Sequence, residues 1–133
     1  MKVTVIGAGN SGFAMAAHLS KFGNKVTLWN RSPGAISKLM KTKVIRTFGV
    51  IRGDIPIYNA TNDIKVALED PDVILITTPA SSHKELAELI AKNINKSTVI
   101  ILNPGRTFGA LVFSNIFKKY NKAHKQTIAE AQT

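Results

Sequence analysis

The sequence has no cysteine among its 133 residues, which excludes disulfides, thiolate catalysis and zinc–sulfur sites. It also has no run near the ~18 apolar residues that a membrane-spanning helix needs. Both absences favour an intracellular protein, and we expect it to be cytoplasmic. The acidic residues and histidines do not cluster at spacings that suit a metal ion, so we expect no metal site.

Acidic residues are also scarce, because 8 Asp and Glu stand against 18 Lys and Arg, for a net charge of +10. A basic protein can bind nucleic acid, but these lysines are spread along the chain without interleaved aromatic residues. The densest group, from Lys118 to Lys125, falls around the end of a predicted helix, where cations interact favourably with the helix dipole. We therefore expect neither nucleic acid nor membrane as a partner, and we assign the charge to the handling of phosphate anions.

Three glycines follow the first apolar segment of the chain. Residues 2–6 read as a buried strand, residues 7–12 are Gly-Ala-Gly-Asn-Ser-Gly, and a helical pattern follows. Between a strand and a helix, the spacing G-x-G-x-x-G indicates a dinucleotide site. Gly7 permits a tight turn, Gly9 lets a pyrophosphate approach the backbone, and Gly12 lets helix and strand pack closely. The alternative is a glycine-rich turn that binds nothing, but the flanking elements favour the site.

The residues after the second predicted strand indicate which dinucleotide binds. An acidic side chain about 20 residues beyond the glycines is typical of an NAD site, but no acid precedes Asp54 here, whereas nine Lys and Arg do. The strand at 25–29 is followed by Asn30, Arg31 and Ser32. Arg31 and Ser32 suit a 2′-phosphate, and a charged hydrogen bond of about 1.5–3 kcal/mol would give Arg31 roughly a ten- to hundredfold preference. Capping of the next helix by Ser32 is the alternative, but it leaves Arg31 unexplained, so we predict NADP over NAD.

Apolar strands alternate with helical patterns along the chain. This alternation predicts a single α/β domain with a doubly wound parallel sheet, the Rossmann arrangement, and a small β-rich insertion near 43–58. The predicted strands are 2–6, 25–29, 43–48, 55–58, 72–77, 98–102 and 127–131, and the predicted helices are 10–22, 32–41, 63–68, 82–92 and 108–120. The helical stripes expected to face the core are Met15, Leu19 and Phe22; Leu86, Leu89 and Ile90; and Phe113, Ile116, Phe117 and Tyr120.

Four polar turns follow the predicted parallel strands, where ligands bind such sheets. Two are the glycine-rich loop and Asn30-Arg31-Ser32. The others are residues 77–80, Thr-Thr-Pro-Ala, and residues 103–107, Asn-Pro-Gly-Arg-Thr. Each could be an ordinary strand-to-helix turn, but all four are expected along one edge of the sheet, which favours a functional role.

His83 is the best-placed titratable side chain. Ser82 and Glu85 have the spacing of a capping box, which would place His83 in the first turn of a helix. His83 precedes Leu86 by three residues, so both should lie on the same, inward face of the helix. We therefore expect His83 to face the crevice in which the cofactor binds. The positive end of the helix dipole would keep the imidazole neutral and able to hydrogen-bond a ligand. We hypothesise a cofactor or substrate contact, although a packing or surface histidine at a helix start is the commoner case.

The chain resembles the octopine/nopaline (opine) dehydrogenase family, within the wider group of 6-phosphogluconate-dehydrogenase-like Rossmann proteins. The resemblance rests on the motif at 7–12, on Thr-Pro-Ala-Ser-Ser-His at 78–83, on Leu-Asn-Pro-Gly-Arg-Thr-Phe-Gly-Ala-Leu at 102–111 and on the closing residues 128–133. Asn-Pro-Gly-Arg-Thr is the most specific of these stretches. Members of the family reductively condense an amino acid with a 2-oxo acid, using hydride from a nicotinamide cofactor. The resemblance therefore implies an NAD(P)-dependent oxidoreductase.

The resemblance also implies which residues hold the cofactor. Gly7, Gly9, Asn10, Ser11 and Gly12 would hold the pyrophosphate, Asn30, Arg31 and Ser32 the adenosine ribose phosphate, and Thr78, Pro79, Asn103, Pro104 and Gly105 would border the nicotinamide. The family's catalytic His–Asp pair and most substrate contacts belong to a second, mainly helical domain, and residues 1–133 correspond to the dinucleotide-binding domain. We therefore expect no catalytic residue here, a small-molecule substrate bound through the second domain, and an isolated domain that is inactive and able to form a homodimer.

Two alternatives remain open. A reductase of the ketopantoate or glycerol-3-phosphate type shares the fold and the Asn-Arg-Ser tip, although the Asn-Pro-Gly-Arg-Thr segment argues against it. A free-standing NADP-binding module with a regulatory rather than a catalytic role would also fit, because a fold alone does not fix a function.

Overall fold

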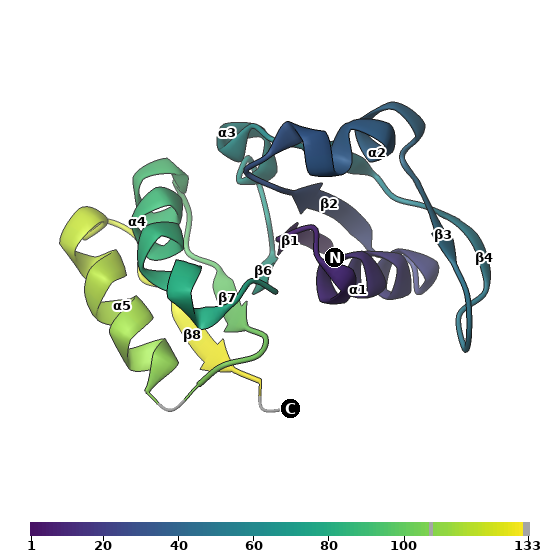
Figure 1. Ribbon diagram of the computed structural model, residues 1–133. Coiled ribbons are helices and arrows are strands. Elements are labelled where there is room, and N and C mark those ends of the chain that lie inside the picture. Colours follow the sequence, from purple (N-terminus) through teal and green to yellow (C-terminus); the bar gives the residue numbers. More distant parts are fainter. Residues whose placement is uncertain (107, 132–133) are drawn as a thin grey trace.

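A six-stranded parallel sheet forms the centre of the molecule in the computed structural model, which describes residues 1–106 and 108–131 (Figure 1). The strands lie in the order β5 (Asn59–Thr61), β2 (Lys25–Trp29), β1 (Lys2–Ile6), β6 (Val73–Ile76), β7 (Val99–Leu102) and β8 (Thr127–Glu130), and every neighbouring pair is parallel. The chain starts at the middle of this order and builds outward in both directions, which confirms the doubly wound α/β class. Thr107 and the closing Gln132 and Thr133, which contribute to the family resemblance, lie outside the described residues.

The middle strands of the sheet are apolar on both faces. β1 pairs with β2 on one side and β6 on the other, so that Ile6 lies between Trp29 and Ile76. Ile6 and Ile76 are fully buried. A strand covered on both faces needs apolar side chains on both, which is why β6 lacks the polar alternation of a half-exposed strand.

Helices cover both faces of the sheet (Figure 1). The first face carries α1 (Asn10–Lys21), the 3-10 turn η1 (Pro33–Ile36) and α2 (Ser37–Thr42), and the second carries α3 (Ile64–Ala67), the 3-10 turn η2 (Ala80–Ser82), α4 (His83–Asn93) and α5 (Gly109–Tyr120). α4 and α5 pack side by side. Each face has its own buried apolar cluster, so the sheet separates two halves of the core.

The segment after α2 differs from its prediction at two strands. A hairpin of β3 (Val44–Thr47) and β4 (Gly53–Pro56) confirms the β-rich insertion. The strand predicted at 55–58 is displaced towards the N-terminus, because pairing ends at Pro56 and the chain then enters the parallel sheet at Asn59. The strand that begins there, β5, was not predicted. It is three residues long and starts with asparagine, so it lacks the apolar run by which a buried strand is recognised.

The apolar stripe predicted for α1 is wrong at Phe22. This side chain is 69% exposed, whereas the helix buries Gly12, Ala16 and Ala17. Small residues on the buried face let the helix approach the sheet closely. Phe22 lies past the last turn, as the C-cap, and the other two residues of the stripe are only half-buried.

The remaining helices follow their predictions more closely. Leu86 in α4 and Phe113 and Phe117 in α5 are buried, while Tyr120, in the last turn of α5, is 45% exposed. The helix predicted at 32–41 begins as the 3-10 turn η1 and becomes α-helical only afterwards. These differences concern the ends of elements, where local periodicity is least informative.

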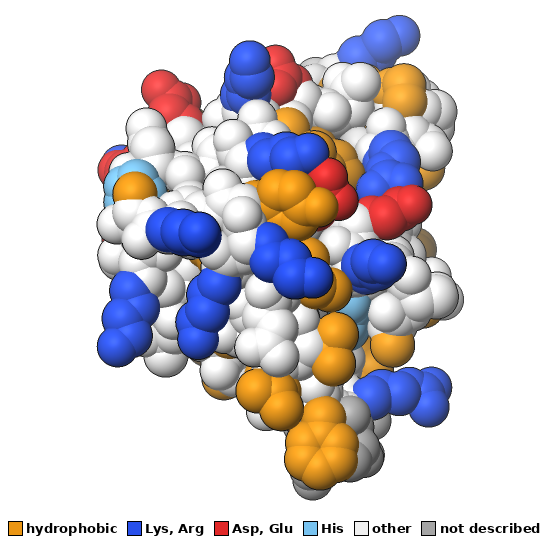
Figure 2. Space-filling model, turned by 90° about the vertical axis from the view of Figure 1, so that its left-hand side faces the viewer, with side chains coloured by type: hydrophobic (Ala, Val, Ile, Leu, Met, Phe, Trp, Pro, Cys, Tyr) orange, Lys and Arg blue, Asp and Glu red, His pale blue; other side chains and the backbone are white. Residues whose placement is uncertain are grey.

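The chain carries a net charge of +10, and on the side drawn in Figure 2 the basic side chains are not gathered in one patch. Figure 2 shows the side on which α4 and α5 lie, where Lys and Arg side chains stand apart from one another with uncharged surface between them. Phe108, Leu111 and Val112, around the start of α5, are each more than half exposed. Within the described residues, no helix is both long enough and apolar enough to cross a membrane.

Gly12 has no room for a side chain. A Cβ there would lie 1.8 Å from the Gly7 carbonyl oxygen, a backbone atom that cannot turn aside. We expect Gly12→Ala to lower the free energy of unfolding by more than about 3 kcal/mol or to prevent folding. Urea denaturation followed by circular dichroism measures this. Gly34→Ala is the control, because a Cβ there meets no atom within 4 Å, and equal stability of the two variants would contradict the contact.

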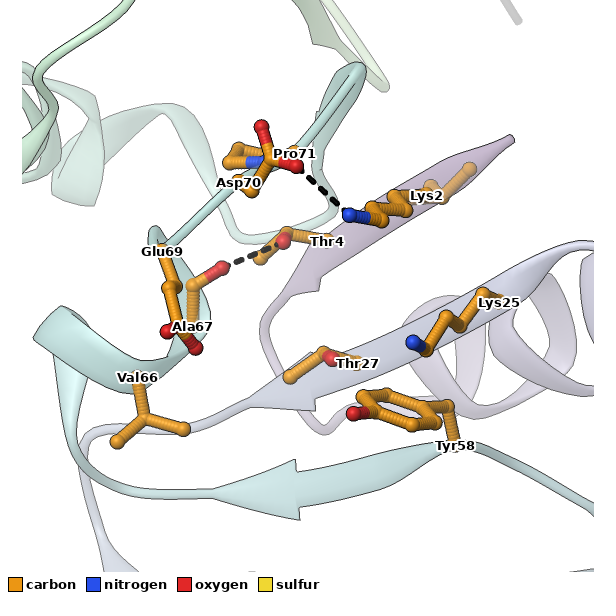
Figure 3. Close-up of a pocket in the computed structure, with 11 residues that line it drawn as sticks. Lys2, Thr4, Lys25, Thr27, Tyr58, Val66, Ala67, Glu69, Asp70 and Pro71 are labelled. Carbon is orange, nitrogen blue, oxygen red and sulfur yellow. Dashed lines mark hydrogen bonds and ion pairs between the residues drawn. The ribbon is translucent and has the colours of Figure 1, made fainter.

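Asp70 gives the fold a dependence on acid pH. Lys2 Nζ donates to its carboxylate at 2.7 Å (Figure 3). Lys96 Nζ donates to the same carboxylate at 2.8 Å, and these bonds lower the pKa of Asp70 to about 2. Because the pKa is lower in the folded state than in the unfolded state, the pairs stabilise the fold above about pH 4 and lose their effect as the pH falls towards 2. We expect Asp70→Asn to lower the urea midpoint more at pH 6 than at pH 3. An equal change at both pH values would contradict this. Glu69→Gln is the control, since this neighbouring carboxylate makes no ion pair in the described part of the chain.

Candidate functional site

The glycine-rich loop between β1 and α1 is fixed by close contacts. Gly7 adopts a positive φ of 108°, and its N–H donates to the Trp29 carbonyl oxygen at 2.9 Å. A Cβ on Gly7 would come within 2.7 Å of Thr78 Cγ2. Gly12 in turn brings α1 against the Gly7 carbonyl. Glycine at these two positions therefore lets the loop, the helix and the tip of β6 meet.

The first turn of α1 offers backbone N–H groups that have no partner within the helix. The N-cap is Gly9, which has no side chain to cap the helix. The first helical bond runs from Phe13 N–H to the Gly9 carbonyl oxygen at 3.0 Å. Gly9, Asn10 and Ser11 are exposed and uncharged, and a Cβ on Gly9 would meet no atom within 4 Å. Free N–H groups at the positive end of a helix dipole, with open space before them, fit a pyrophosphate.

Asn30 ties the tip of β2 to the glycine-rich loop. Its side-chain oxygen accepts a hydrogen bond from Ala8 N–H at 3.1 Å, and its side-chain NH₂ donates to the Ser32 carbonyl oxygen at 3.1 Å. Its backbone N–H donates to the Thr61 carbonyl oxygen at 3.2 Å, which links the tip to β5. The side chain predicted to contact the ribose phosphate is therefore engaged within the protein, where it fixes the loops on either side.

Arg31 and Ser32 are exposed at the same tip. Ser32 is the N-cap of η1, but its side chain makes no capping bond within the described chain. Arg31 Nη1 donates to Glu85 Oε2 at 2.8 Å, so an ion pair joins the tip of β2 to the start of α4. This pair joins residues 54 positions apart and was not predicted, because the spacing of Ser82 and Glu85 indicated a capping box instead.

The predicted capping box at the start of α4 is wrong. Ser82 Oγ forms hydrogen bonds with Thr78 Oγ1 and the Pro79 carbonyl oxygen, each at 2.7 Å. Ser82 has φ −92° and ψ −9°, because the turn η2 already precedes α4. An N-cap serine instead needs an extended backbone to reach an amide of the first turn. The early turn thus leaves Glu85 free to reach Arg31.

His83 is buried at the start of α4 and positions Thr78. Its Nε2 lies 3.2 Å from the Thr78 carbonyl oxygen, and because a carbonyl can only accept, Nε2 carries the hydrogen. Burial lowers the pKa of His83, and the bond to Thr78 opposes this shift in part. A neutral histidine that holds the Thr78 loop has a packing role, and its contact with a cofactor or substrate stays a prediction.

The tips of β6 and β7 complete the edge beside the glycine-rich loop. Thr77 Oγ1 donates to the last carbonyl of β1 at 2.9 Å, and Asn103 N–H donates to the last carbonyl of β6 at 2.8 Å. The side-chain NH₂ of Asn103 lies 3.6 Å from Met15 Sδ on α1. Pro79 and Pro104 are exposed. The four polar turns therefore follow four adjacent parallel strands, as predicted.

Glu130 supports this edge from β8, a role that the sequence did not reveal. Its carboxylate accepts a hydrogen bond from the N–H of Ala110, in the first turn of α5, where the helix dipole favours a negative charge. A Cβ on Gly105 would come within 2.5 Å of Glu130 Cβ, and Gly105 N–H donates to the Ala131 carbonyl oxygen at 2.9 Å. Gly105 thus lets β8 approach the turn that follows β7.

A hollow of about 490 Å³ opens beside Arg31, and sequence reasoning did not find it. Its lining residues are Trp29, Arg31, Asn62, Ile64, Glu85, Glu88, Leu89 and Lys92. They come from three separate stretches of chain, so no local pattern marks the hollow. The indole N–H of Trp29 is buried and has no hydrogen-bond partner among the described residues.

A second hollow, of about 310 Å³, lies at the opposite end of the sheet (Figure 3). Lys2, Lys25, Tyr58 and Asp70 line it with other residues, and Lys25 Nζ lies 3.9 Å from the centre of the Tyr58 ring. None of the predicted cofactor residues lines this hollow. Doubly wound sheets bind ligands at the carboxyl ends of their strands, so the glycine-rich edge is the candidate site.

Comparison with known proteins matches residues 2–129 to the family described as NAD-dependent glycerol-3-phosphate dehydrogenase N-terminus. The chain is 38% identical over 130 residues to opine dehydrogenase from Arthrobacter sp. (strain 1C), a match that covers 97% of this chain and 36% of the relative. It is 28% identical over 102 residues to glycerol-3-phosphate dehydrogenase (NAD(P)+) from Thermoanaerobacter sp. (strain X514), with 76% of this chain and 30% of the relative covered. The chain therefore spans about a third of the length of these relatives.

The same fold occurs in a solved structure of octopine dehydrogenase in complex with NADH and agmatine. The TM-score is 0.74 at 18% identity, over 95% of this chain and 34% of that chain. The family match extends over nearly the whole chain, and the glycine-rich loop and strand order agree with it. The chain is a Rossmann-type dinucleotide-binding domain and belongs to the family of the NAD-dependent glycerol-3-phosphate dehydrogenase N-terminus.

Proposed function

We propose that this chain is the NADP-binding domain of an opine-dehydrogenase-like oxidoreductase. The observation that supports binding most directly is the start of α1, where exposed N–H groups face open space beside Gly9. A pyrophosphate bound there is stabilised by the helix dipole and by bonds from the backbone amides. Glycine at position 9 keeps this space clear, because a side chain would stand where the phosphate approaches.

The choice of NADP over NAD rests on the tip of β2. Arg31 and Ser32 are exposed there, and no acidic residue precedes Asp54 in the sequence. A guanidinium can bind a 2′-phosphate through two parallel hydrogen bonds, and the Ser32 hydroxyl can donate a third. Asn30 supports both residues by tying the tip to the glycine-rich loop.

Hydride transfer to an imine is the reaction that we propose for the whole protein. The cofactor supplies a hydride for the carbon of an imine formed from an amino acid and a 2-oxo acid, and the imine nitrogen takes up a proton. In this chain, the turns at 78–79 and 103–105 border the nicotinamide, and His83 positions the first of them. A second domain binds the substrate. The 38% identity to opine dehydrogenase supports this choice of reaction.

A glycerol-3-phosphate-type reductase is the second candidate, because the matching family bears that description. The turn at 103–107, Asn-Pro-Gly-Arg-Thr, favours the opine type. Turnover by the full-length protein separates the two. Oxidation of NADPH that requires both a 2-oxo acid and an amino acid supports the opine type, whereas turnover of dihydroxyacetone phosphate or of a 2-oxo acid alone contradicts it.

Gly9→Ala tests the pyrophosphate site without disturbing the fold. A Cβ at this position has room in the protein but occupies the space before the first turn of α1. We expect affinity for both NADPH and NADH to fall by at least about tenfold, equal to ~1.4 kcal/mol, with the unfolding midpoint unchanged. Isothermal titration measures the affinities, with Gly34→Ala as the control. Unchanged affinity in Gly9→Ala would place the pyrophosphate elsewhere.

Arg31→Ala tests the choice of cofactor. We expect affinity for NADPH to fall roughly ten- to hundredfold while affinity for NADH changes little, because only NADPH presents a 2′-phosphate. Fluorescence of Trp29, in the wall of the adjacent hollow, reports binding. Arg46→Ala is the matched control, since this exposed arginine also forms an ion pair, with Asp54 at 3.0 Å in the β3–β4 hairpin. An equal loss for both dinucleotides in Arg31→Ala would exclude a role in selectivity.

A further inference from the structure

Arg31 and Glu85 come from different walls of the hollow beside the tip of β2. Arg31 follows β2, Glu85 lies in the first turn of α4, and Nη1 and Oε2 of the two residues are 2.8 Å apart. Their side chains are 60% and 67% exposed, so an anion from solvent can reach the guanidinium and displace the carboxylate. Ion pairs this exposed contribute little to stability, so the fold does not depend on this one.

The Glu85 carboxylate and a 2′-phosphate use the same donors. A guanidinium presents a planar fork that binds one oxyanion through parallel N–H bonds. With Glu85 on Nη1, a phosphate can still reach Nε and Nη2, but it meets a guanidinium whose charge is already offset. It gains the fork formed by Nη1 and Nη2 only by displacing the carboxylate. A ribose with a free 2′-hydroxyl does not compete with Glu85 for the guanidinium, because the hydroxyl is neutral.

We propose that Glu85 is a selectivity residue that opposes NADPH binding by competing with the 2′-phosphate for Arg31. This rests on the proposed function, in which Arg31 binds that phosphate. To use the fork that includes Nη1, NADPH exchanges the carboxylate for its phosphate, whereas NADH binds with the ion pair intact. The ion pair, rather than Arg31 alone, sets the ratio of NADPH affinity to NADH affinity. By weakening the preference for NADPH, the pair favours the use of both dinucleotides.

The test compares NADPH and NADH affinities of the wild-type chain, Glu85→Gln, Arg31→Ala and the double variant, by titration of Trp29 fluorescence. We expect Glu85→Gln to tighten NADPH binding by about three- to tenfold and to leave NADH binding within about twofold. Most of this gain in NADPH affinity should disappear when Arg31→Ala is also present, because the Glu85 carboxylate then has no guanidinium for which to compete with the phosphate.

Glu88→Gln is the matched control for the loss of charge. Glu88 lies on the same helix and lines the same hollow, but its carboxylate accepts a hydrogen bond from Lys92 Nζ at 2.6 Å. Its removal should leave the ratio of NADPH to NADH affinity unchanged. An equal gain in Glu88→Gln would reveal a general charge effect and overturn the specific role of Glu85.

Two further results would also overturn the role of Glu85. One is an unchanged ratio of NADPH to NADH affinity in Glu85→Gln, and the other is the same gain in NADPH affinity with and without Arg31. The wild-type ratio reports separately on the proposed function, because a preference for NADH would contradict NADP as the cofactor. The role of Glu85 would still be confirmed in that case if Glu85→Gln raised NADPH affinity only when Arg31 was present.

Discussion

The contact between Gly12 and the Gly7 carbonyl is the constraint on which the site depends. A Cβ at position 12 would lie 1.8 Å from that oxygen, so only glycine lets α1 rest on the end of β1. Ala16 and Ala17 continue the close approach along the helix. The start of α1 is thereby fixed beside the carboxyl ends of the middle strands, and its free N–H groups open onto the space beyond that edge.

Around this contact, hydrogen bonds tie the loops to one another. Asn30 binds Ala8 N–H in the glycine-rich loop, Thr77 binds the end of β1, and His83 binds the Thr78 carbonyl. Loops joined in this way are pre-organised, which reduces the cost of ordering them around a ligand. Arg31 is the charged exception, because its partner Glu85 is another exposed side chain rather than backbone.

Local pattern predicted most of the fold. β1 and β2 begin and end where apolar periodicity places them, and the glycine spacing identifies the turn between β1 and α1. Prediction failed where a segment was too short or its context overrode the pattern. β5 has three residues and no apolar run, Phe22 continues a stripe beyond the end of its helix, and Ser82 lies inside a turn that begins before the expected cap.

The sequence by itself determined the doubly wound class and the glycine-rich turn before α1, because strand periodicity and glycine spacing are local properties of the chain. It also placed Arg31 at a strand tip. Only the tertiary structure decided what these groups touch. Glu85 pairs with Arg31 from 54 residues away, and Glu130 crosses from β8 to Ala110. Such contacts follow from the packing of helices against a sheet, which brings together groups that no sequence spacing relates.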